Sequence, residues 1–483
     1  MSKDAVNTAV AAPREPAAQT PADAGDAGYS KDLKARHVNM IAIGGAIGTG
    51  LFLGAGGRLH SAGPALALAY LVCGVFAFFV VRALGELVLY RPSSGSFVSY
   101  SREFLGEKGA YVAGWMYFLN WSTTGIADIT AIALYTHYWS LFTDIPQWLL
   151  ALAALAVVLA VNLISVKIFG EMEFWFAIVK VATLVAFMLI GVFLLATRHE
   201  VGGTTPGLSV ITDNGGLLPH GAMPVVLVMQ GVIFAYAALE LVGVAAGETA
   251  EPEKVVPRAV NSIMWRVGLF YCGSVVLLAL LLPGSVYSGD ESPFVTVLSK
   301  IGVPAAGDVM NLVVLTAAMS SLNSGLYSTG RILRSMATAG SAPKFTARMN
   351  RSQVPYGGIL LTCAVCVLGV GLNYLVPSKA FEIVLNVASL GIISTWVIIM
   401  VCHLVFVRRA RAGLLSRPGF RLPGSPVTEI ATIAFLLACL GLMADDPEVG
   451  RKTLLLVPLI AAALVAGWFA VRRRVNASPA DVS

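Results

Sequence analysis

IAIGGAIGTGLFLGAGG, residues 41–57, decides how the rest of this sequence is interpreted. The stretch lies in the first long apolar segment, yet Gly44, Gly45, Gly48 and Gly50 stand close together within it. Glycine inside a helix costs about 1 kcal/mol relative to alanine, so a helix here is expected to open near its middle. The same glycines would also suit close packing against a second helix, and glycine content alone leaves both interpretations open.

An opened helix inside a bilayer needs partners for its freed backbone groups, because the hydrocarbon core supplies no water. The N–H groups at the start of the second half-helix would be placed to hold a carboxylate. The stretch therefore predicts either a packing point or an anion-binding site in the first span.

The composition is that of a polytopic membrane protein. Of the 483 residues, 57% are hydrophobic and 12% are charged, which lies far outside the soluble range. An all-α protein with twelve transmembrane helices is expected. The predicted spans are 38–58, 63–85, 109–138, 147–166, 171–196, 221–245, 261–282, 306–331, 356–376, 381–407, 427–444 and 454–471. The net charge of +6 fits basic loops on one membrane side and does not indicate nucleic acid.

The basic residues predict the orientation. With the N-terminus in the cytoplasm, 26 of the 33 Lys and Arg residues fall on that side and six, including Arg58, fall outside. Lys180 lies within a span. The positive-inside rule then predicts a multi-pass protein of the inner (cytoplasmic) membrane with both termini cytoplasmic. Residues 1–30 are expected to be a disordered tail, residues 31–474 the transmembrane domain, and residues 475–483 a short second tail.

The sixth predicted span is the second irregular one. It reads GVIFAYAALELVGVAAGE over residues 231–248 and carries Glu240 in an apolar run. If the first ten spans form an inverted repeat of five plus five, the sixth span is the symmetry mate of the first. A central site is therefore expected where broken helices 1 and 6 meet, with the last two helices peripheral.

Three ionisable residues lie at membrane depth: Asp128, Lys180 and Glu240. Such groups cost roughly 2.5–3.5 kcal/mol on insertion and commonly serve function. Structural alternatives remain open: a packing acceptor for Asp128, an ion pair for Lys180, and backbone hydrogen bonds for Glu240. The functional interpretations are an acid that binds a polar substrate and, for Lys180, a fixed cation in place of a sodium ion. Burial disfavours a charged lysine, so this group could release a proton.

Other functional classes have weaker support. A channel would need a continuous polar stripe, an ATPase a nucleotide-binding loop, and an intramembrane enzyme a catalytic pair, whereas His403 stands isolated in the sequence. The CxxC pair Cys363 and Cys366 has no second Cys or His pair beside it, so no metal site is expected. An amino acid sensor that keeps the same binding site stays open as an alternative to a transporter.

Several stretches resemble the bacterial amino acid transporters of the amino acid–polyamine–organocation superfamily. They are GGAIGTGLFLG, RPSSGSFVSY, FGEMEFWFAIVK, ELVGVAAGETAEPEK and SSLNSGLYSTGRIL. Within that superfamily, RPSSGSFVSY and the run at 127–139 look most like the L-asparagine permeases. The resemblance implies a proton symporter that imports L-asparagine, with aspartate, serine, alanine, glycine or GABA as alternatives. It implies no cofactor beyond the proton gradient, and only the amino acid and the lipid bilayer as partners, with no nucleic acid and no obligatory protein.

The resemblance also implies roles for single residues. The substrate carboxylate would meet the N–H groups of Thr49 and Gly50, and Gly48 would allow its approach. The expected amine-binding carbonyls belong to Ala46, Phe234, Ala235 and Ala237, and the Phe234 ring would be a gate. Asp128 and Glu240 complete the expected substrate-binding set, and Lys180 would couple transport to protons.

Two features of the resemblance bear on the helix geometry. Relatives often have glycine at the positions of Ala237 and Ala238, so the opening of the sixth span is less secure here. The SLNSGLYSTGR run, with Asn323 and Ser324, matches a motif at the contact between the two helix groups of such transporters.

Overall fold

The computed structural model describes residues 36–37, 40, 47–247, 249, 251–289, 291–375, 380–445 and 450–475. Every named element in this part of the chain is helical, apart from one isolated bridge between Val201 and Thr204. Eight helical stretches there are long and apolar enough to cross a membrane, and two shorter helices are apolar as well. The expected all-α membrane fold is confirmed, while the number of twelve spans stays a prediction.

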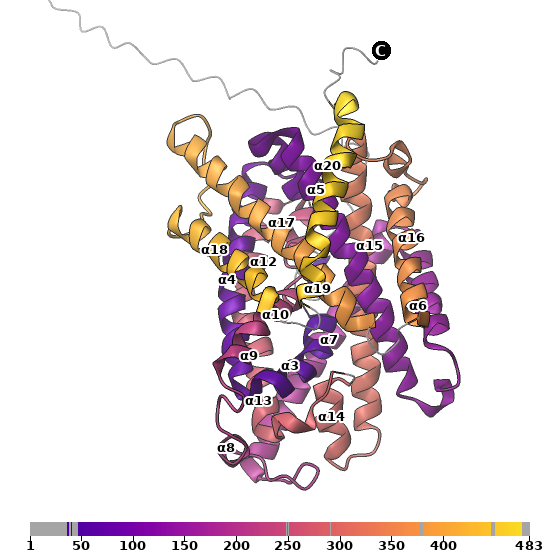
Figure 1. Ribbon diagram of the computed structural model, residues 1–483, viewed down its shortest axis with the longest axis vertical. Coiled ribbons are helices and arrows are strands. Elements are labelled where there is room, and N and C mark those ends of the chain that lie inside the picture. The colour runs from indigo at the N-terminus through magenta and orange to yellow at the C-terminus, as the bar shows by residue number, and fades with distance from the viewer. Residues whose placement is uncertain are drawn as a thin grey trace, which may run out of the picture.

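The first and sixth predicted spans are divided into short helices (Figure 1). The described part of the first span comprises α2 (Thr49–Phe52) and α3 (Gly54–Ala62). The sixth comprises α9 (Ala222–Leu227), α10 (Met229–Ala235) and α11 (Leu241–Ala246). The seventh is α12 (Pro252–Arg266), a π-helical stretch η4 (Val267–Gly273) and α13 (Ser274–Leu281).

The other predicted spans are single helices. They are α4 (Leu66–Tyr90), α5 (Ser96–His137), α6 (Gln147–Asn162), α7 (Val166–Thr197), α15 (Ala306–Thr338), α16 (Tyr356–Leu375), α17 (Ala380–Arg411), α18 (Val427–Leu442) and α20 (Leu456–Val475). Short helices α8 (Leu208–Thr212), α14 (Pro293–Lys300) and α19 (Gly450–Leu454) connect them.

The long helices form two groups. α5 packs against both α15 and α17, and α4 packs against α12 and η4. α15 is buried along most of its length because it is surrounded by α5, α6, α7, α14 and α16. The short helices of the two divided spans lie beside both groups, since α10 contacts α4 as well as α17.

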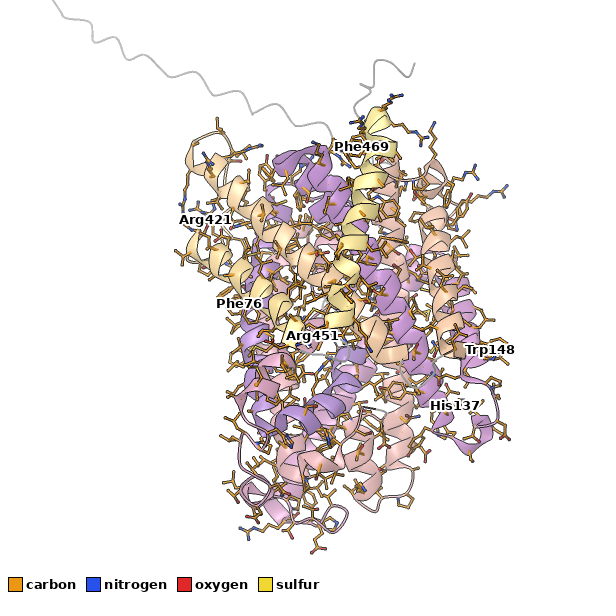
Figure 2. The ribbon with its side chains drawn as sticks, in the orientation of Figure 1. Phe76, His137, Trp148, Arg421, Arg451 and Phe469 are labelled. Carbon is orange, nitrogen blue, oxygen red and sulfur yellow. The ribbon has the colours of Figure 1, made fainter. Side chains whose placement is uncertain are left out.

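The last two predicted spans are peripheral. α18 joins α4 through a stacked pair of rings, Phe76 and Phe435, whose centroids are 4.1 Å apart; Phe76 is labelled in Figure 2. α20 has no buried residue and contacts α5, where Trp468 packs on Tyr111. An apolar helix with no buried residue fits a lipid-facing position in a bilayer.

The two ends of the molecule carry different loops. α8 and α14 lie together at one end, called the α8 end below, and the loop between α17 and α18 lies at the other (Figure 1). At the α8 end, the loop after α7 is joined to the end of α14, where the Gly202 N–H donates to the Lys300 carbonyl at 3.1 Å. Arg421 lies toward the opposite end from His137 (Figure 2).

The stretch between the second and third predicted spans, residues 91–108, contains a short helix. Its helix forms the start of α5 and is kinked from the rest at Gly106, which has a φ of 79°. That short helix is not a surface helix, because Phe97 and Phe104 are buried and the Phe104 ring packs on Phe406 of α17. Its apolar face is covered by protein and not by lipid.

Candidate functional site

The first span opens at Gly48, the N-cap of α2. Its backbone is extended, with φ −127° and ψ −161°. The Gly48 carbonyl accepts hydrogen bonds from the N–H groups of Leu51 and Phe52, both at 3.2 Å. Within the described chain, the N–H groups of Thr49 and Gly50 donate to no acceptor. Backbone donors are therefore available where the substrate carboxylate is expected. Ala46 lies outside the described residues.

The sixth span opens between Ala235 and Leu241. Ala238 has a φ of +76°, a left-handed conformation that costs an L-residue with a side chain roughly 1–2 kcal/mol. The sixth span therefore opens here even though Ala237 and Ala238 favour a continuous helix. Neighbouring tyrosines hold it, because the Tyr236 hydroxyl donates to the Tyr70 carbonyl at 2.7 Å and the Tyr271 hydroxyl donates to the Ala235 carbonyl at 3.1 Å.

The two breaks touch at Gly50. A Cβ atom added there would lie 2.6 Å from the Cα of Ala235, so only glycine allows α2 to approach α10 this closely. Gly48 is less constrained, since its added Cβ would be 3.7 Å from the Ser321 hydroxyl of α15. The expectation that helices 1 and 6 meet is confirmed for the described part of the first span, and Gly50 is a point of close approach.

The three expected amine-binding carbonyls of the sixth span differ in their partners. The Phe234 carbonyl accepts from the Ala237 N–H at 3.0 Å, and the Ala235 carbonyl accepts from Tyr271. Among the described residues, the Ala237 carbonyl accepts no hydrogen bond. It is the acceptor of the three that is open to a substrate ammonium group. The Phe234 ring is buried, and its role as a gate stays a prediction.

Asp128 joins α5 to the first break. Its Oδ1 accepts a hydrogen bond from the Thr49 hydroxyl at 2.9 Å, and both residues are buried. Its Oδ2 has no hydrogen-bond partner in the described part of the chain. A buried acceptor left unsatisfied costs about 1–3 kcal/mol, so Oδ2 is suited to accept a hydrogen bond from a bound ligand.

Lys180 belongs to a buried polar chain between α7 and α15. Its Nζ donates to the Ser320 hydroxyl at 2.9 Å, and that hydroxyl donates to Oε2 of Glu173 at 2.7 Å. Oε1 of Glu173 accepts from the Asn323 side chain at 2.8 Å. Lys180 and Glu173 are both fully buried. Residues 41–46, which precede the opening of the first span, lie outside the described chain.

Glu173 is a residue that the sequence interpretation missed. It lies seven residues before Lys180 on α7, which places both side chains on one face of the helix. That spacing was the available signal. In the sequence, Glu173 lies near the start of the span predicted at 171–196, where a carboxylate is common at the membrane surface. Nothing in the sequence indicated that α15 would bury it.

Glu240 faces α17. The Trp396 indole N–H lies 3.5 Å from its Oε2, and its Oε1 has no hydrogen-bond partner among the described residues. Glu240 is fully buried. Its partners belong to a different helix from those of Asp128, so the structure places the two expected substrate-binding carboxylates in separate surroundings.

His403 is not isolated, contrary to the sequence interpretation. Its Nε2 lies 3.0 Å from Oε2 of Glu86, and its Nδ1 lies 2.9 Å from Oε1 of Glu429. Arg417 also bonds to Glu86. His403, Glu86 and Glu429 are fully buried and join α17 to α4 and α18. Chain positions more than 300 residues apart meet here, which no sequence motif could indicate.

Arg58 was expected on the outer surface, but it is only 9% exposed. It extends from α3 back to the first break, where its Nη1 donates to the Gly50 carbonyl at 2.9 Å. A cavity of about 540 Å³ lies beside it, lined by residues of α3, α10 and α17. Arg58 is buried because its side chain packs against α10. The distribution of basic residues in the sequence carries no information on that packing, and it therefore put Arg58 on the outer surface.

Metal binding has no candidate in the described part of the chain. No group of three or more His, Cys, Asp and Glu side chains there could hold an ion. All six cysteines are free.

A helical membrane protein whose two opened helices meet at buried polar groups has the architecture of a secondary transporter. A family model for amino acid permeases matches residues 37–478. The chain therefore belongs to the amino acid permease family.

Relatives from three organisms are similar over nearly their whole length. An L-asparagine permease from Streptomyces coelicolor is 88% identical, over 98% of this chain and 97% of the relative. L-asparagine permeases from Salmonella typhimurium and Escherichia coli are 62% and 60% identical, each over 94% of this chain and 91% of the relative.

Proposed function

We propose that this permease imports L-asparagine across the inner (cytoplasmic) membrane by proton symport, with both termini in the cytoplasm. The observation that carries the substrate is the high identity to several permeases named for L-asparagine, at 59–88% over at least 91% of each relative.

The site geometry supports a zwitterion with a polar side chain. The N–H groups of Thr49 and Gly50 suit its carboxylate, and the open carbonyl of Ala237 suits its ammonium group. Oδ2 of Asp128 can accept one N–H of a substrate carboxamide, which offers two donors. An apolar side chain would leave that buried oxygen unsatisfied, and a site of this kind discriminates strongly against analogues that lack the donor.

The buried chain Lys180–Ser320–Glu173 supports proton coupling. A coupling ion can bias two conformations only through its different affinity for them. A lysine whose surroundings change between the two conformations can hold a proton in one and release it in the other, since burial disfavours its charged form. Ser320 connects this lysine to a carboxylate on the same helix.

Uptake of labelled L-asparagine into liposomes that contain only this protein tests the proposal. Each of the twenty amino acids and GABA is added as a competitor, and imposed proton and sodium gradients are compared. We expect unlabelled asparagine to compete best and an inward proton gradient to drive accumulation without sodium. Stronger competition by aspartate, serine, alanine, glycine or GABA would show that this compound, and not asparagine, is the preferred substrate. Sodium-driven uptake would refute the proton mechanism, and binding without uptake would indicate a sensor.

A further inference from the structure

Arg58 is a buried cation without an anionic partner. Its Nη1 donates to the Gly50 carbonyl at 2.9 Å and lies 3.5 Å from the Tyr70 hydroxyl. Within the described chain it has no other polar contact and no carboxylate at ion-pair distance. A guanidinium carries five N–H donors and stays charged at all accessible pH values. Burial of such a charge is costly unless an anion or further acceptors meet it, so its remaining donors are suited to an anionic ligand.

Two glycines shape a slot around this side chain. A Cβ added at Gly54 of α3 would lie 2.8 Å from Nη2 of Arg58, and one added at Gly231 of α10 would lie 2.8 Å from its Nε. Any larger residue on either helix would displace the guanidinium. The absence of side chains at these two positions therefore leaves room for the guanidinium between α3 and α10.

The guanidinium adjoins the cavity of about 540 Å³, a volume in the usual range for small-molecule sites. Leu53, Gly57 and Tyr287 contribute to its lining. α3 and α9, which also line it, lie toward the α8 end of the molecule (Figure 1), and the proposed topology puts that end outside. The cavity is thus on the side from which an imported substrate arrives.

The cavity also carries two side-chain amides. Nε2 of Gln230 on α10 donates to Oδ1 of Asn386 on α17 at 2.7 Å, and both residues line the cavity. Amides offer donors and acceptors together. The cavity therefore combines one fixed cation with groups that can bind an ammonium or a carboxamide.

We propose that this cavity is a loading site, in which Arg58 binds the α-carboxylate of an incoming amino acid before it reaches the break at Gly48. The inference rests on the proposed function, because it takes the amino acid to be the cargo. Arg58 already holds the carbonyl of Gly50, whose own N–H belongs to the expected carboxylate cradle. A carboxylate bound at Arg58 would consequently be next to its final position.

The test compares two ligands that differ in the carboxylate. L-asparagine and its methyl ester, which lacks the negative charge, compete with labelled asparagine for uptake by the wild type and by Arg58→Met. The wild type should prefer asparagine to the ester. In Arg58→Met this preference should fall at least tenfold, and the KM for asparagine should rise by a similar factor while kcat changes little.

Two further variants serve as controls. Arg58→Lys keeps a cation with fewer donors, so its preference should lie between those of the wild type and Arg58→Met, and it provides the comparison if Arg58→Met does not fold. Lys300→Met removes an exposed cation of α14 that lies outside the lining of this cavity, and it should keep the wild-type preference.

A purely structural role for Arg58 makes a different forecast. If Arg58 only holds the Gly50 carbonyl, its loss should disturb the cradle used during transport and lower kcat, so a wild-type KM with a reduced kcat, or an unchanged preference, would overturn the loading site. If the wild type does not carry asparagine, the proposed substrate fails separately. The same ratio is then measured with the amino acid that it does carry and the methyl ester of that amino acid.

Discussion

The Thr49 hydroxyl donates a 2.9 Å hydrogen bond to Oδ1 of Asp128, which ties the opened first span to α5. Thr49 is the first residue of α2, directly after the break at Gly48. The bond therefore fixes the backbone donors of the expected cradle relative to a carboxylate that retains one open oxygen. The two sides of the substrate site are positioned by a single contact.

Removal of the Thr49 hydroxyl should weaken asparagine uptake. Thr49→Val has nearly the same shape but leaves Oδ1 of Asp128 without its donor, at a cost of about 1–3 kcal/mol. We expect the KM for asparagine to rise about tenfold in liposome uptake, whereas Thr49→Ser should stay near the wild type because it keeps the hydroxyl. Wild-type kinetics in Thr49→Val would show that the bond does not position the site.

Alanine should be tolerated at Gly48 and not at Gly50. In Gly50→Ala the new Cβ would lie 2.6 Å from backbone of α10, so the two helices must separate at a cost of about 1–3 kcal/mol. Thermal unfolding in detergent and uptake should both be impaired. Gly48→Ala should unfold like the wild type, because among the described residues its Cβ meets nothing closer than 3.7 Å.

The bulkier variant Gly48→Val then reports on the substrate, because the Cβ position clashes with none of the described residues. It should fold and yet lose asparagine binding, since its side chain would obstruct approach to the backbone donors. Gly371→Ala is the matched control, because nothing lies within 4 Å of the added atom there. Normal asparagine binding by purified Gly48→Val would rule out the cradle.

The opening at Gly48 could be predicted because helix propensity is local: several glycines in one short stretch weaken any helix that contains them. The opening of the sixth span was less secure from sequence, since Ala237 and Ala238 favour a helix. There the Tyr236 hydroxyl bonds to α4 and the Tyr271 hydroxyl of η4 bonds to the Ala235 carbonyl, on either side of the stretch in which Ala238 is left-handed, and tertiary packing overrides propensity. Tertiary packing also explains why the sequence put Arg58 on the outer surface, since its burial depends on α10.

His403 illustrates a second limit of the sequence, since its two carboxylate partners come from distant helices. Breaking a buried ion pair by removing one partner costs about 3–5 kcal/mol. His403→Ala should therefore lower the midpoint of thermal unfolding markedly while the folded fraction keeps a KM near the wild-type value, because the cluster lies apart from the break. An unchanged midpoint would mean that Arg417 and solvent compensate for the loss, and a large change in KM would place the cluster in the transport site.

Lys180 provides the sharpest test of energy coupling. If this residue takes up and releases the coupled proton, Lys180→Ala should lose accumulation of asparagine under an imposed inward proton gradient. Lys180→Arg should fail as well, because arginine keeps its charge at all accessible pH values, although it could still donate to Ser320. Exchange of internal for external asparagine needs no net proton movement, so both variants should retain some exchange if they fold.

Glu173→Gln should give a partial loss of accumulation, since it keeps the side-chain shape and removes the charge to which Ser320 donates. Accumulation and exchange are measured in the same liposomes. Full accumulation by Lys180→Arg would show that Lys180 is structural and that the proton binds elsewhere, whereas loss of exchange together with accumulation in every variant would point to misfolding of α7 against α15.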